Sequence, residues 1–300
     1  MKNLPDFLII GAARAGTTAL YRYLRQSPQI FMPDVKETNF FAYKDRALTI
    51  EGPGADFINN SVTRLEAYQA LFAAAPDGAI RGEASPLYLF EPGTAETIRA
   101  IVPDVKLVCI LRNPIDQAFS HFLYATKLRV ETLPDFTEAL MREDERLAKN
   151  WQPLFGYSRF ARFGTQLERF LAVFPREQML LLTYDRYEAE PEAVMAEILA
   201  FVGADPAFVP DMSKRANAGG VPKNKAFQDF IMKPNPITGL VALMLPLALR
   251  RAIRDRLAAL NTRTDKTMPP RARAILTERL TPEIRKIEQI LGQDLGHWLR

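Results

Sequence analysis

Apolar positions along this chain alternate between short uninterrupted runs and longer segments with helical spacing. The runs have the length of strands and lie at 7–10, 106–111 and 178–183. Apolar residues recur every three or four positions between them, most clearly at 64–75, 115–127, 159–173 and 191–202. Continuous apolar runs are typical of strands buried on both faces, and their alternation with helices favours a parallel sheet between helical layers. We therefore predict an α/β fold with three layers.

The last quarter of the chain has a different pattern. From about Lys233 the strand signal stops, and the predicted helices are interrupted by prolines, among them Pro246 and Pro269-Pro270. Two stretches rich in Gly, Asn, Pro and charge, 44–61 and 211–225, are predicted loops, and the second is long enough to be functional. We find no internal repeat, so we predict one domain over 1–300 with a helix-rich C-terminal part.

Composition restricts the class of protein. A hydrophobic share of 48% over 300 residues is ample for a core, and the net charge is only +4. Such a charge fits an anionic ligand better than nucleic acid, because no dense Lys/Arg block is present. The single cysteine, Cys109, lies in an apolar run and excludes a disulfide framework, and with only two histidines the chain lacks the usual ligands of a zinc site.

The sequence contains no segment with the pattern of a leader or a membrane span. Residues 1–5 are too short for a signal peptide, and no run reaches the ~20 apolar residues that cross a bilayer. The longest candidate, 237–249, is broken by Pro246; we predict a buried helix there, with peripheral membrane contact as the alternative. We expect a cytoplasmic protein, and the Ala- and Arg-rich composition favours a bacterial source. Oligomeric state cannot be predicted from these features.

The loop at 11–18 is the first candidate site. It follows the first strand and carries Gly11, Arg14, Gly16, Thr17 and Thr18 before an amphipathic segment begins. Two glycines, hydroxyl side chains and a helix N-terminus together form a cradle for an anion. A Walker A loop needs Gly-Lys-Ser/Thr at its end, whereas here Thr17 follows Gly16 and the cation lies inside the loop. A plain strand-to-helix turn is the alternative.

The second candidate follows the strand at 106–111. Arg112 stands at its carboxyl end, Asn113 can cap a helix, Pro114 suits the first helical position and Ser120 falls in the second turn. A guanidinium and a hydroxyl so placed can hold one phosphate, at the edge where open α/β sheets bind ligands. The alternative is an ion-paired arginine beside an exposed serine.

The third candidate is the run 36–41, Lys-Glu-Thr-Asn-Phe-Phe. A Lys-Glu pair is usually solvated, but this pair precedes the aromatic Phe40 and Phe41, which favour partial burial. Glu37 is then a candidate general base, and Lys36 could stabilise developing charge.

Together these motifs resemble the sulfotransferases that use 3′-phosphoadenosine 5′-phosphosulfate (PAPS), most closely the heparan sulfate branch and its bacterial relatives. In that family Gly-x-x-Lys/Arg-x-Gly-Thr-Thr binds the 5′-phosphosulfate, and Leu-Arg-Asn-Pro followed after five residues by Ser-His binds the 3′-phosphate. The resemblance implies a P-loop-like fold and, for cofactor contacts, the residues Arg14, Ala15, Gly16, Thr17, Thr18, Arg112 and Ser120.

The resemblance also implies a base and an acceptor side. The glycan branch carries Lys-Glu-x-His-Phe-Phe, whose Glu deprotonates the acceptor; here Asn39 replaces the His, which weakens the case for a heparan-like acceptor. Arg14 replaces the common Lys, which favours clamping of the transferred group over protonation of a leaving oxygen. The implied acceptor-side residues are Lys36, Glu37, Phe40, Glu83, Ser85 and Tyr88.

Three weaker matches lie later in the chain. Tyr157 follows Gly156 before an amphipathic segment, and 217–225 resembles the loop that closes over the nucleotide, with Gly220 and Lys223 as candidate contacts. The C-terminal run 291–298 is similar to the end of the family's sequences. The resemblance therefore covers nearly the whole chain.

The implied reaction is transfer of a sulfo group from PAPS to a hydroxyl or amine, with PAP as product and without a metal ion. The catalytic residues would be Glu37, Arg14 and Lys36. Glycan, lipid, peptide and small-metabolite acceptors all stay open. The strongest alternative is a P-loop kinase or NTPase, in which Asp185 after the strand at 178–183 would hold magnesium. A catalytically inactive binding protein is a third possibility.

Overall fold

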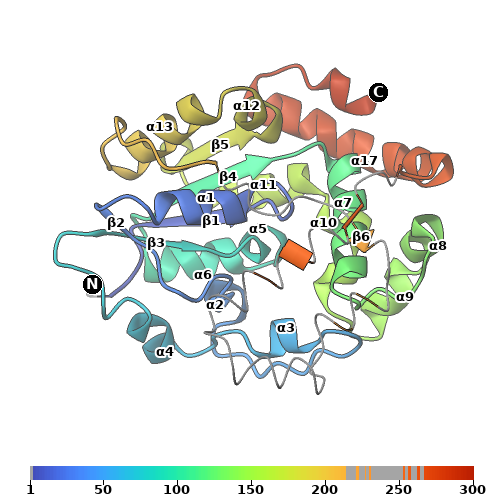
Figure 1. The fold of residues 1–300 in the computed structure, drawn as a ribbon, viewed down its shortest axis with the longest axis horizontal. Helices are drawn as coiled ribbons and strands as arrows, with labels where there is room; N and C mark the ends of the chain where they lie inside the picture. The colour runs from blue at the N-terminus through green and yellow to red at the C-terminus, as the bar shows by residue number, and fades with distance from the viewer. Residues whose placement is uncertain are drawn as a thin grey trace.

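A five-stranded parallel sheet forms the centre of the protein (Figure 1). The computed structural model describes residues 3–213 and 267–300, with short stretches at 221–222, 227, 230, 253, 256–257 and 262–263. The strands are β1 (Phe7–Gly11), β2 (Ile30–Phe31), β3 (Ile80–Ala84), β4 (Lys106–Leu111) and β5 (Met179–Thr183). Their order is β2-β3-β1-β4-β5. The strands β2 and β3 lie on one side of β1, and β4 and β5, which come later in the chain, lie on the other. The carboxyl end of β1 is thus the point where ligands bind in such sheets.

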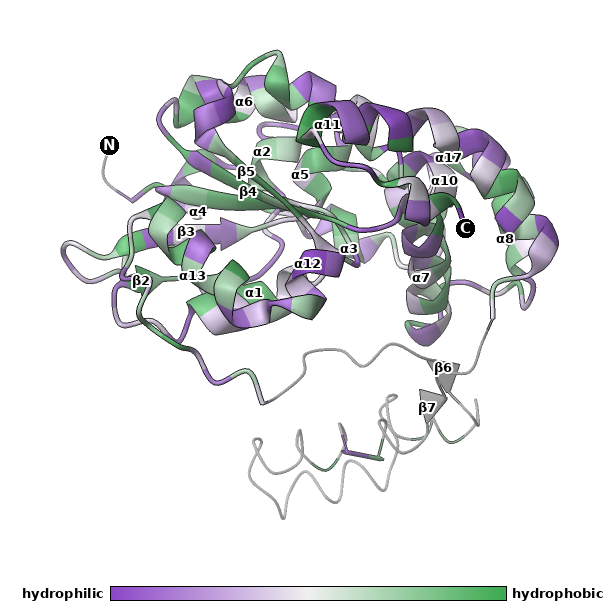
Figure 2. Ribbon diagram, turned by 90° about the horizontal axis from the view of Figure 1, so that it is seen from above, coloured by the Kyte–Doolittle hydropathy of each residue, from purple (hydrophilic) through white to green (hydrophobic). Residues whose placement is uncertain are grey.

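Helices cover both faces of this sheet. Figure 2 shows α1, α12 and α13 on one side and α6 and α11 on the other. The helices as far as β4 are α1 (Thr17–Leu24), α2 (Phe40–Tyr43), α3 (Asp56–Asn59), α4 (Leu65–Ala70), α5 (Leu87–Phe90) and α6 (Thr94–Ile101). Those after it are α7 (Pro114–Lys127), α8 (Phe136–Met141), α9 (Glu143–Ala148), α10 (Tyr157–Phe160), α11 (Phe163–Leu171), α12 (Tyr184–Ala189), α13 (Pro191–Val202) and α17 (Pro270–Leu291).

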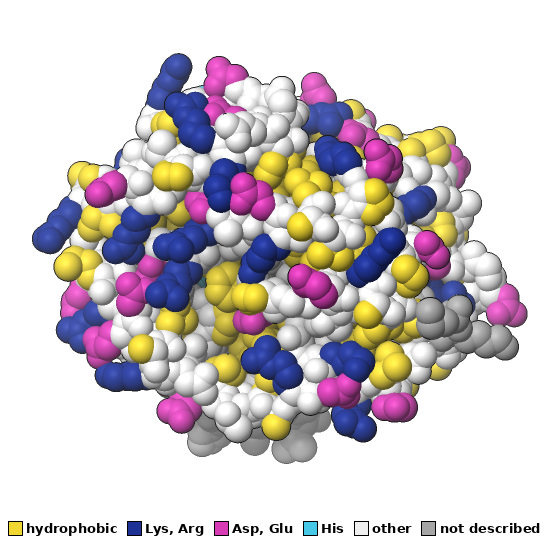
Figure 3. Space-filling view, turned by 180° about the vertical axis from the view of Figure 1, so that it is seen from behind, with side chains coloured by type: hydrophobic (Ala, Val, Ile, Leu, Met, Phe, Trp, Pro, Cys, Tyr) yellow, Lys and Arg dark blue, Asp and Glu magenta, His cyan; other side chains and the backbone are white. Residues whose placement is uncertain are grey.

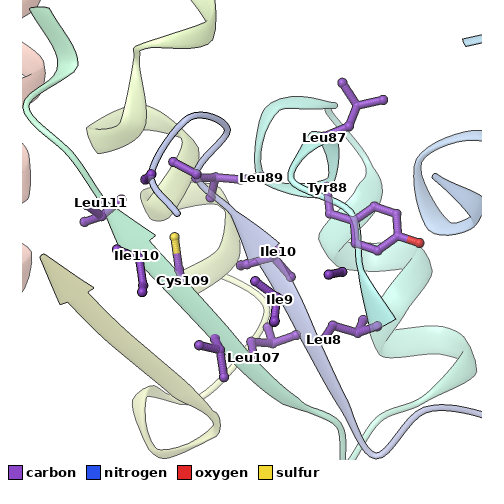
Figure 4. Close-up of a cluster of buried hydrophobic side chains, with 14 of the residues drawn as sticks. Leu8, Ile9, Ile10, Leu87, Tyr88, Leu89, Leu107, Cys109, Ile110 and Leu111 are labelled. Atoms are coloured by element: carbon purple, nitrogen blue, oxygen red, sulfur yellow. The ribbon is translucent and has the colours of Figure 1, made fainter. Parts of the chain in front are cut away.

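The core lies where β1 and β4 meet α5 (Figure 4). Leu8 and Ile10 of β1, Leu107 of β4 and Leu89 of α5 are all buried, and Cys109 lies among them. Burial of this kind is the main stabilising contribution to the fold. It also raises the pKa of the Cys109 thiol, so this residue behaves as a small apolar side chain.

The C-terminal helix α17 packs against α11 and α7 (Figure 1). At the crossing with α11, Gly164 leaves no room for a side chain, because a Cβ there would lie 2.6 Å from the carbonyl oxygen of Glu283. The Glu283 carboxylate accepts hydrogen bonds from the backbone N–H and the hydroxyl of Thr165, at 2.7 and 2.8 Å. The end of the chain is thereby fixed beside the helices that follow β4.

The predicted layered α/β class is confirmed. The three predicted strands are β1, β4 and β5, and the helices predicted at 115–127 and 191–202 are α7 and α13. Other boundaries are wrong: 64–75 contains the shorter α4, and 159–173 is divided between α10 and α11. The loop predicted at 44–61 contains the one-turn α3, and a two-residue strand, β7 (Thr262–Arg263), lies in the segment expected to be free of strands.

The strand β3 has no apolar run that would reveal it, and the run at β2, residues 30–32, is too short to do so. β3 reads Ile-Arg-Gly-Glu-Ala and is held by pairing with β1 and β2. Its glycine is required by packing, since a Cβ on Gly82 would lie 2.1 Å from the ring of Phe7. Tertiary contacts, not local pattern, decide this strand.

The surface carries charges of both signs. On the face in Figure 3, Lys and Arg side chains are interspersed with Asp and Glu and with smaller apolar areas. This agrees with the net charge of +4. Within 3–213 and 267–300, no helix combines the length and the apolar character needed to cross a bilayer.

Candidate functional site

The loop between β1 and α1 is shaped to approach a ligand. Gly16 adopts φ = 91° and caps α1, and no side chain bonds to this cap. Since the first turn of a helix has N–H groups without intrahelical partners, those of Thr17 and Thr18 are available to an anion. The N–H of Ala15 is different, because it bonds to the carbonyl oxygen of Ala12 at 3.2 Å. Residues 15–18 are the predicted cofactor contacts of this loop, and among them the N–H of Ala15 already has a partner within the protein.

Arg14 joins the two predicted phosphate motifs. The Nε of Arg14 donates to the hydroxyl of Ser120 at 3.4 Å. Nη1 of Arg112 donates to the main-chain carbonyl oxygen of Arg14 at 3.3 Å. Each guanidinium also lies over an aromatic ring: Arg14 is 4.5 Å from the centre of Tyr124, and Arg112 is 5.1 Å from that of Tyr184. The structure thus brings the amino-terminal loop and the Arg112–Ser120 pair into one cluster of positive charge.

The start of α7 positions Arg112 and Ser120. Asn113 caps the helix by accepting from the N–H of Ile115 at 2.9 Å, and Pro114 occupies its first position, as predicted. The Asn113 side chain also donates to the carbonyl oxygen of Trp298 at 2.9 Å. The residue beside Arg112 is therefore held from both the helix and the C-terminus.

The electrostatics of this cluster suit an anion. Burial lowers the pKa of Arg14; the phenol of Tyr124 opposes this shift and the neighbouring charge of Arg112 adds to it. An arginine remains charged under such conditions. The charge of Arg112 repels that of the desolvated Arg14, and a bound anion would relieve that repulsion.

Lys36 and Glu37 form an ion pair beside the end of β3. The N–H of Glu37 bonds to the carbonyl oxygen of Ala84 at 3.0 Å, which fixes the segment to the sheet. The Glu37 side chain is 54% exposed and that of Lys36 only 15%. The carboxylate thus stays open to solvent while the cation lies deeper.

These groups surround one cavity of about 290 Å³. Arg14, Thr17 and Thr18 line it from the amino-terminal loop, and Lys36 and Glu37 from the segment after β2. The first and third candidate motifs therefore face the same space. Ser120 and Arg112 adjoin it through Arg14.

Four of the predicted acceptor-side residues lie beneath the lining of this cavity. Phe40, Glu83, Ser85 and Tyr88 are fully buried, and they are not among the residues that line the cavity. Ser85 donates to Glu83 at 2.5 Å and accepts from the N–H of Asn39 at 3.1 Å. They support the segment that carries Glu37, and Pro86 and Leu87 form the wall beside them.

Glu83 has the environment of a supporting group. Its burial raises the pKa of the carboxyl, and hydrogen bonding to Ser85 opposes that shift. Phe40 stacks on Tyr68 with ring centres 4.3 Å apart. Neither side chain is exposed to an acceptor.

Tyr157, a predicted cofactor contact, is fully buried, with its ring centre 6.2 Å from that of His121. Its hydroxyl donates to Glu131 at 2.6 Å, and the same carboxylate forms a buried ion pair with Arg146 at 2.7 Å. The structure therefore does not bring Tyr157 to the cavity.

Three other predicted features lie outside the described residues: Gly220, Lys223 and the apolar segment 237–249. The two residues between the first pair, Val221–Pro222, form the short strand β6, which pairs with β7 and lies against α7. Val221 and Pro222 therefore lie beside the helix that carries Ser120.

Asp185, the magnesium ligand of the kinase alternative, is engaged elsewhere. Its Oδ2 accepts from Nε1 of Trp298 at 2.6 Å and lies 2.8 Å from Nε2 of His297. In the ranges that the structure describes, no three His, Cys, Asp or Glu side chains are grouped as metal ligands. This carboxylate joins the C-terminus to the sheet.

Sequence reasoning missed several residues of the site. Tyr124 lies one turn after Ser120 on α7, and that spacing could have revealed it. Tyr184 directly follows β5, at the edge that carries the other motifs. Phe57 gave no signal, because it comes from a segment predicted as a loop.

Comparisons with known proteins agree with this geometry. The profile of the sulfotransferase family matches residues 5–207. The crystal structure of a sulfotransferase from Alicyclobacillus acidocaldarius is 30% identical and covers 99% of both chains, with a TM-score of 0.76.

Two curated relatives are more distant. Human heparan sulfate glucosamine 3-O-sulfotransferase 6 is 26% identical over 204 residues, which are 67% of this chain and 53% of that protein. A membrane-associated sulfotransferase of Dictyostelium discoideum is 22% identical and covers 66% of this chain and 56% of its own. The chain spans about half the length of these relatives.

Proposed function

Since this chain belongs to the sulfotransferase family, we propose that it transfers a sulfo group from PAPS to a hydroxyl or amine of an acceptor and releases PAP. The observation that carries the proposal is the contact of Arg14 with both Ser120 and Arg112. One nucleotide with phosphates at two positions would bind both motifs at once. In an ordinary NTPase the Arg112–Ser120 pair would have no ligand to bind.

The anion sites divide between the two motifs. Arg112 and Ser120 would hold the 3′-phosphate, at the carboxyl end of β4 and on α7. The hydroxyls of Thr17 and Thr18 and the N–H groups at 16–18 would hold the 5′-phosphosulfate at the start of α1. Ala15 would contribute close backbone packing.

The transfer itself needs a base and positive charge near the moving group. Glu37, exposed at the cavity, would accept the acceptor's proton. Arg14 and Lys36 line the same cavity and would stabilise charge that develops on the bridging oxygen. PAPS supplies the sulfo group, and the donor set of arginine, lysine and backbone N–H fits its anionic oxygens.

The remaining predicted residues have supporting or unassigned roles. Phe40, Glu83, Ser85 and Tyr88 would act by holding the Glu37 segment. Cofactor contacts by Gly220 and Lys223 stay predictions, as do a single domain over 1–300, a cytoplasmic location and a bacterial source. For Tyr157, burial against Glu131 favours a role in packing.

Calorimetric titration with PAP and with Mg²⁺-ATP tests the nucleotide assignment. We expect PAP to bind in the presence of EDTA and Mg²⁺-ATP to bind weakly or not at all. Isotope-labelled PAPS with mass-spectrometric detection then tests for transfer. Metal-dependent ATP binding without PAP binding would overturn the proposal in favour of a kinase or NTPase.

A further inference from the structure

Beyond the groups that the reaction needs, most of the residues that line the cavity are apolar, and Asn39, Tyr124 and Gln152 add polar atoms to it. Among the described residues that line it, only Arg14, Lys36 and Glu37 carry a formal charge; His121 is held neutral, because burial and the nearby Arg14 lower its pKa to about 3. The apolar wall comprises Phe57, Leu87, Leu128, Leu154 and Phe160.

This charge pattern argues against a polyanionic acceptor. A sulfated glycan would need cations besides those that hold the nucleotide, since each anionic group needs a partner once it leaves water. The described lining offers no such surplus cation. Asn39, which stands where the glycan branch has His, uses its amide to donate to Ser61 at 3.0 Å.

The size of the cavity points the same way. A volume of about 290 Å³ is at the lower end for small-molecule sites, which typically span roughly 300–1,000 Å³. Thr17 and Thr18 line part of this space and would hold the 5′-phosphosulfate, so only the remainder is open to the acceptor. Since an apolar cavity of about 150 Å³ holds benzene, that remainder suits an acceptor of one or two rings.

Phe57 is the residue of the apolar wall best placed to contact a ligand. Its side chain lines the cavity, and the residue is 55% exposed. Its segment is fixed to the opposite wall: Gln152 donates to the carbonyl oxygen of Pro53 at 2.6 Å, and the N–H of Glu51 bonds to Asn150 at 2.9 Å. The Phe57 ring is therefore held in a fixed segment and exposed to solvent, which makes it a suitable contact surface for an apolar ligand.

Building on the proposed sulfotransferase activity, we infer that the acceptor is a small ring alcohol or phenol whose apolar body contacts Phe57 and Leu154. Its hydroxyl oxygen forms the new S–O bond to the sulfo group as the S–O bond to the leaving phosphate of PAPS breaks. The hydroxyl proton passes to Glu37, and the negative charge of the broken bond stays on PAP. Phe57 is thus a specificity-determining residue.

The test compares two classes of acceptor on the full chain. 2-Naphthol represents the ring alcohols, and an unsulfated heparosan oligosaccharide and its N-sulfated form represent glycans. With labelled PAPS, we expect kcat/KM for 2-naphthol to exceed that for either glycan by at least tenfold. Saturation-transfer NMR in the presence of PAP detects naphthol binding independently of turnover.

Variants of Phe57 test the contact itself. Phe57→Ala and Phe57→Asp should raise KM for 2-naphthol about tenfold or more while the Kd of PAP stays unchanged. Met141→Ala is the matched control, because Met141 is 60% exposed on α8 and does not line the cavity. Circular dichroism and PAP binding confirm that each variant is folded.

The outcomes separate the inference from the proposed function. Failure to bind PAP would defeat the proposed function. Retention of PAP binding together with preference for a glycan would overturn the ring-alcohol inference alone. So would unchanged naphthol kinetics in Phe57→Asp, or the absence of both product and NMR signal from 2-naphthol when PAP is bound.

Discussion

The guanidinium of Arg14 donates to the hydroxyl of Ser120 at 3.4 Å although the two residues are 106 positions apart. One belongs to the loop after β1 and the other to the second turn of α7. Their contact places the two anion motifs within the length of one nucleotide. Had they lain on opposite sides of the sheet, a ligand with two phosphate positions could not engage both.

Arg112→Ala should weaken binding of PAP about tenfold to more than a hundredfold, because a hydrogen bond to a charged group contributes ~1.5–3 kcal/mol. Ser120→Ala should have a smaller effect in the same direction. Calorimetry with PAP measures both changes.

A nucleotide without the 3′-phosphate provides the control for Arg112. Adenosine 5′-monophosphate should bind Arg112→Ala and the native protein equally. Arg186→Ala, a half-exposed arginine paired with Glu197, should leave PAP binding unchanged. Equal losses for both nucleotides would mean that Arg112 does not recognise the 3′-phosphate.

Glu37→Gln should lower kcat by 10²-fold or more, since general-base catalysis typically contributes about 10²–10⁴-fold. The amide keeps the shape of the side chain but cannot take the acceptor's proton. The Kd of PAP should stay within about twofold, because Glu37 would not contact the phosphates. Turnover of labelled PAPS with 2-naphthol measures kcat.

The matched control for this substitution is Glu192→Gln, at the exposed start of α13. This substitution removes the same kind of carboxylate from a residue that does not line the cavity, and it should leave kcat unchanged. Near-native turnover in Glu37→Gln would remove this residue from the mechanism.

Features that depend on neighbouring residues could be predicted from the sequence. The strand, loop and helix from Phe7 to Leu24 follow from an apolar run, two glycines and helical spacing. The cap of α7 follows from Asn113 and Pro114 in succession. Both motifs place their side chains at strand ends, so their meeting at one sheet edge was predictable from a parallel sheet.

Features set by packing between distant segments could not. Phe57 reaches the cavity because its loop is fixed to the segment around Gln152, and no local pattern encodes that contact. Tyr157 follows Gly156 as the family pattern suggests, yet its hydroxyl donates to Glu131, which is paired with Arg146. Phe40 is predicted near the acceptor but packs under the lining, since aromatic neighbours surround it.

Trp298→Ala should lower the free energy of unfolding by about 3–5 kcal/mol, the usual cost of truncating a buried Trp. The indole is buried and donates to Asp185 at 2.6 Å. Binding of PAP should also weaken, because loss of the indole bond to Asp185 would release the C-terminus, whose Trp298 main-chain carbonyl accepts from Asn113, the neighbour of Arg112. Urea unfolding and calorimetry measure the two effects.

Asp185→Asn separates this bracing role from metal binding. We expect transfer from PAPS to persist in this variant and in EDTA, with a modest loss of stability. Complete loss of activity in Asp185→Asn, with recovery of the native enzyme only by added Mg²⁺, would instead support a magnesium ligand at this position.

His121 should make the protein less stable in acid. In the folded state burial lowers its pKa to about 3, and the nearby charge of Arg14 adds to the effect; the ordinary value is 6.5. The unfolded state therefore binds a proton that the folded state refuses between these values. The resulting stability is fully present above about pH 6.5 and is lost as the pH falls, at ~1.4 kcal/mol per unit.

Comparison with His121→Phe isolates this contribution, because Glu83, Glu91 and Glu143 have raised pKa values and act in the opposite direction. The variant keeps an aromatic ring against Phe160, which His121 meets edge-to-face with centres 4.7 Å apart. Urea unfolding between pH 4 and 7 measures the difference in free energy between the two proteins. As the pH falls, the native protein should lose stability relative to the variant. A difference independent of pH would show that the imidazole takes up a proton in the folded state as readily as in the unfolded state.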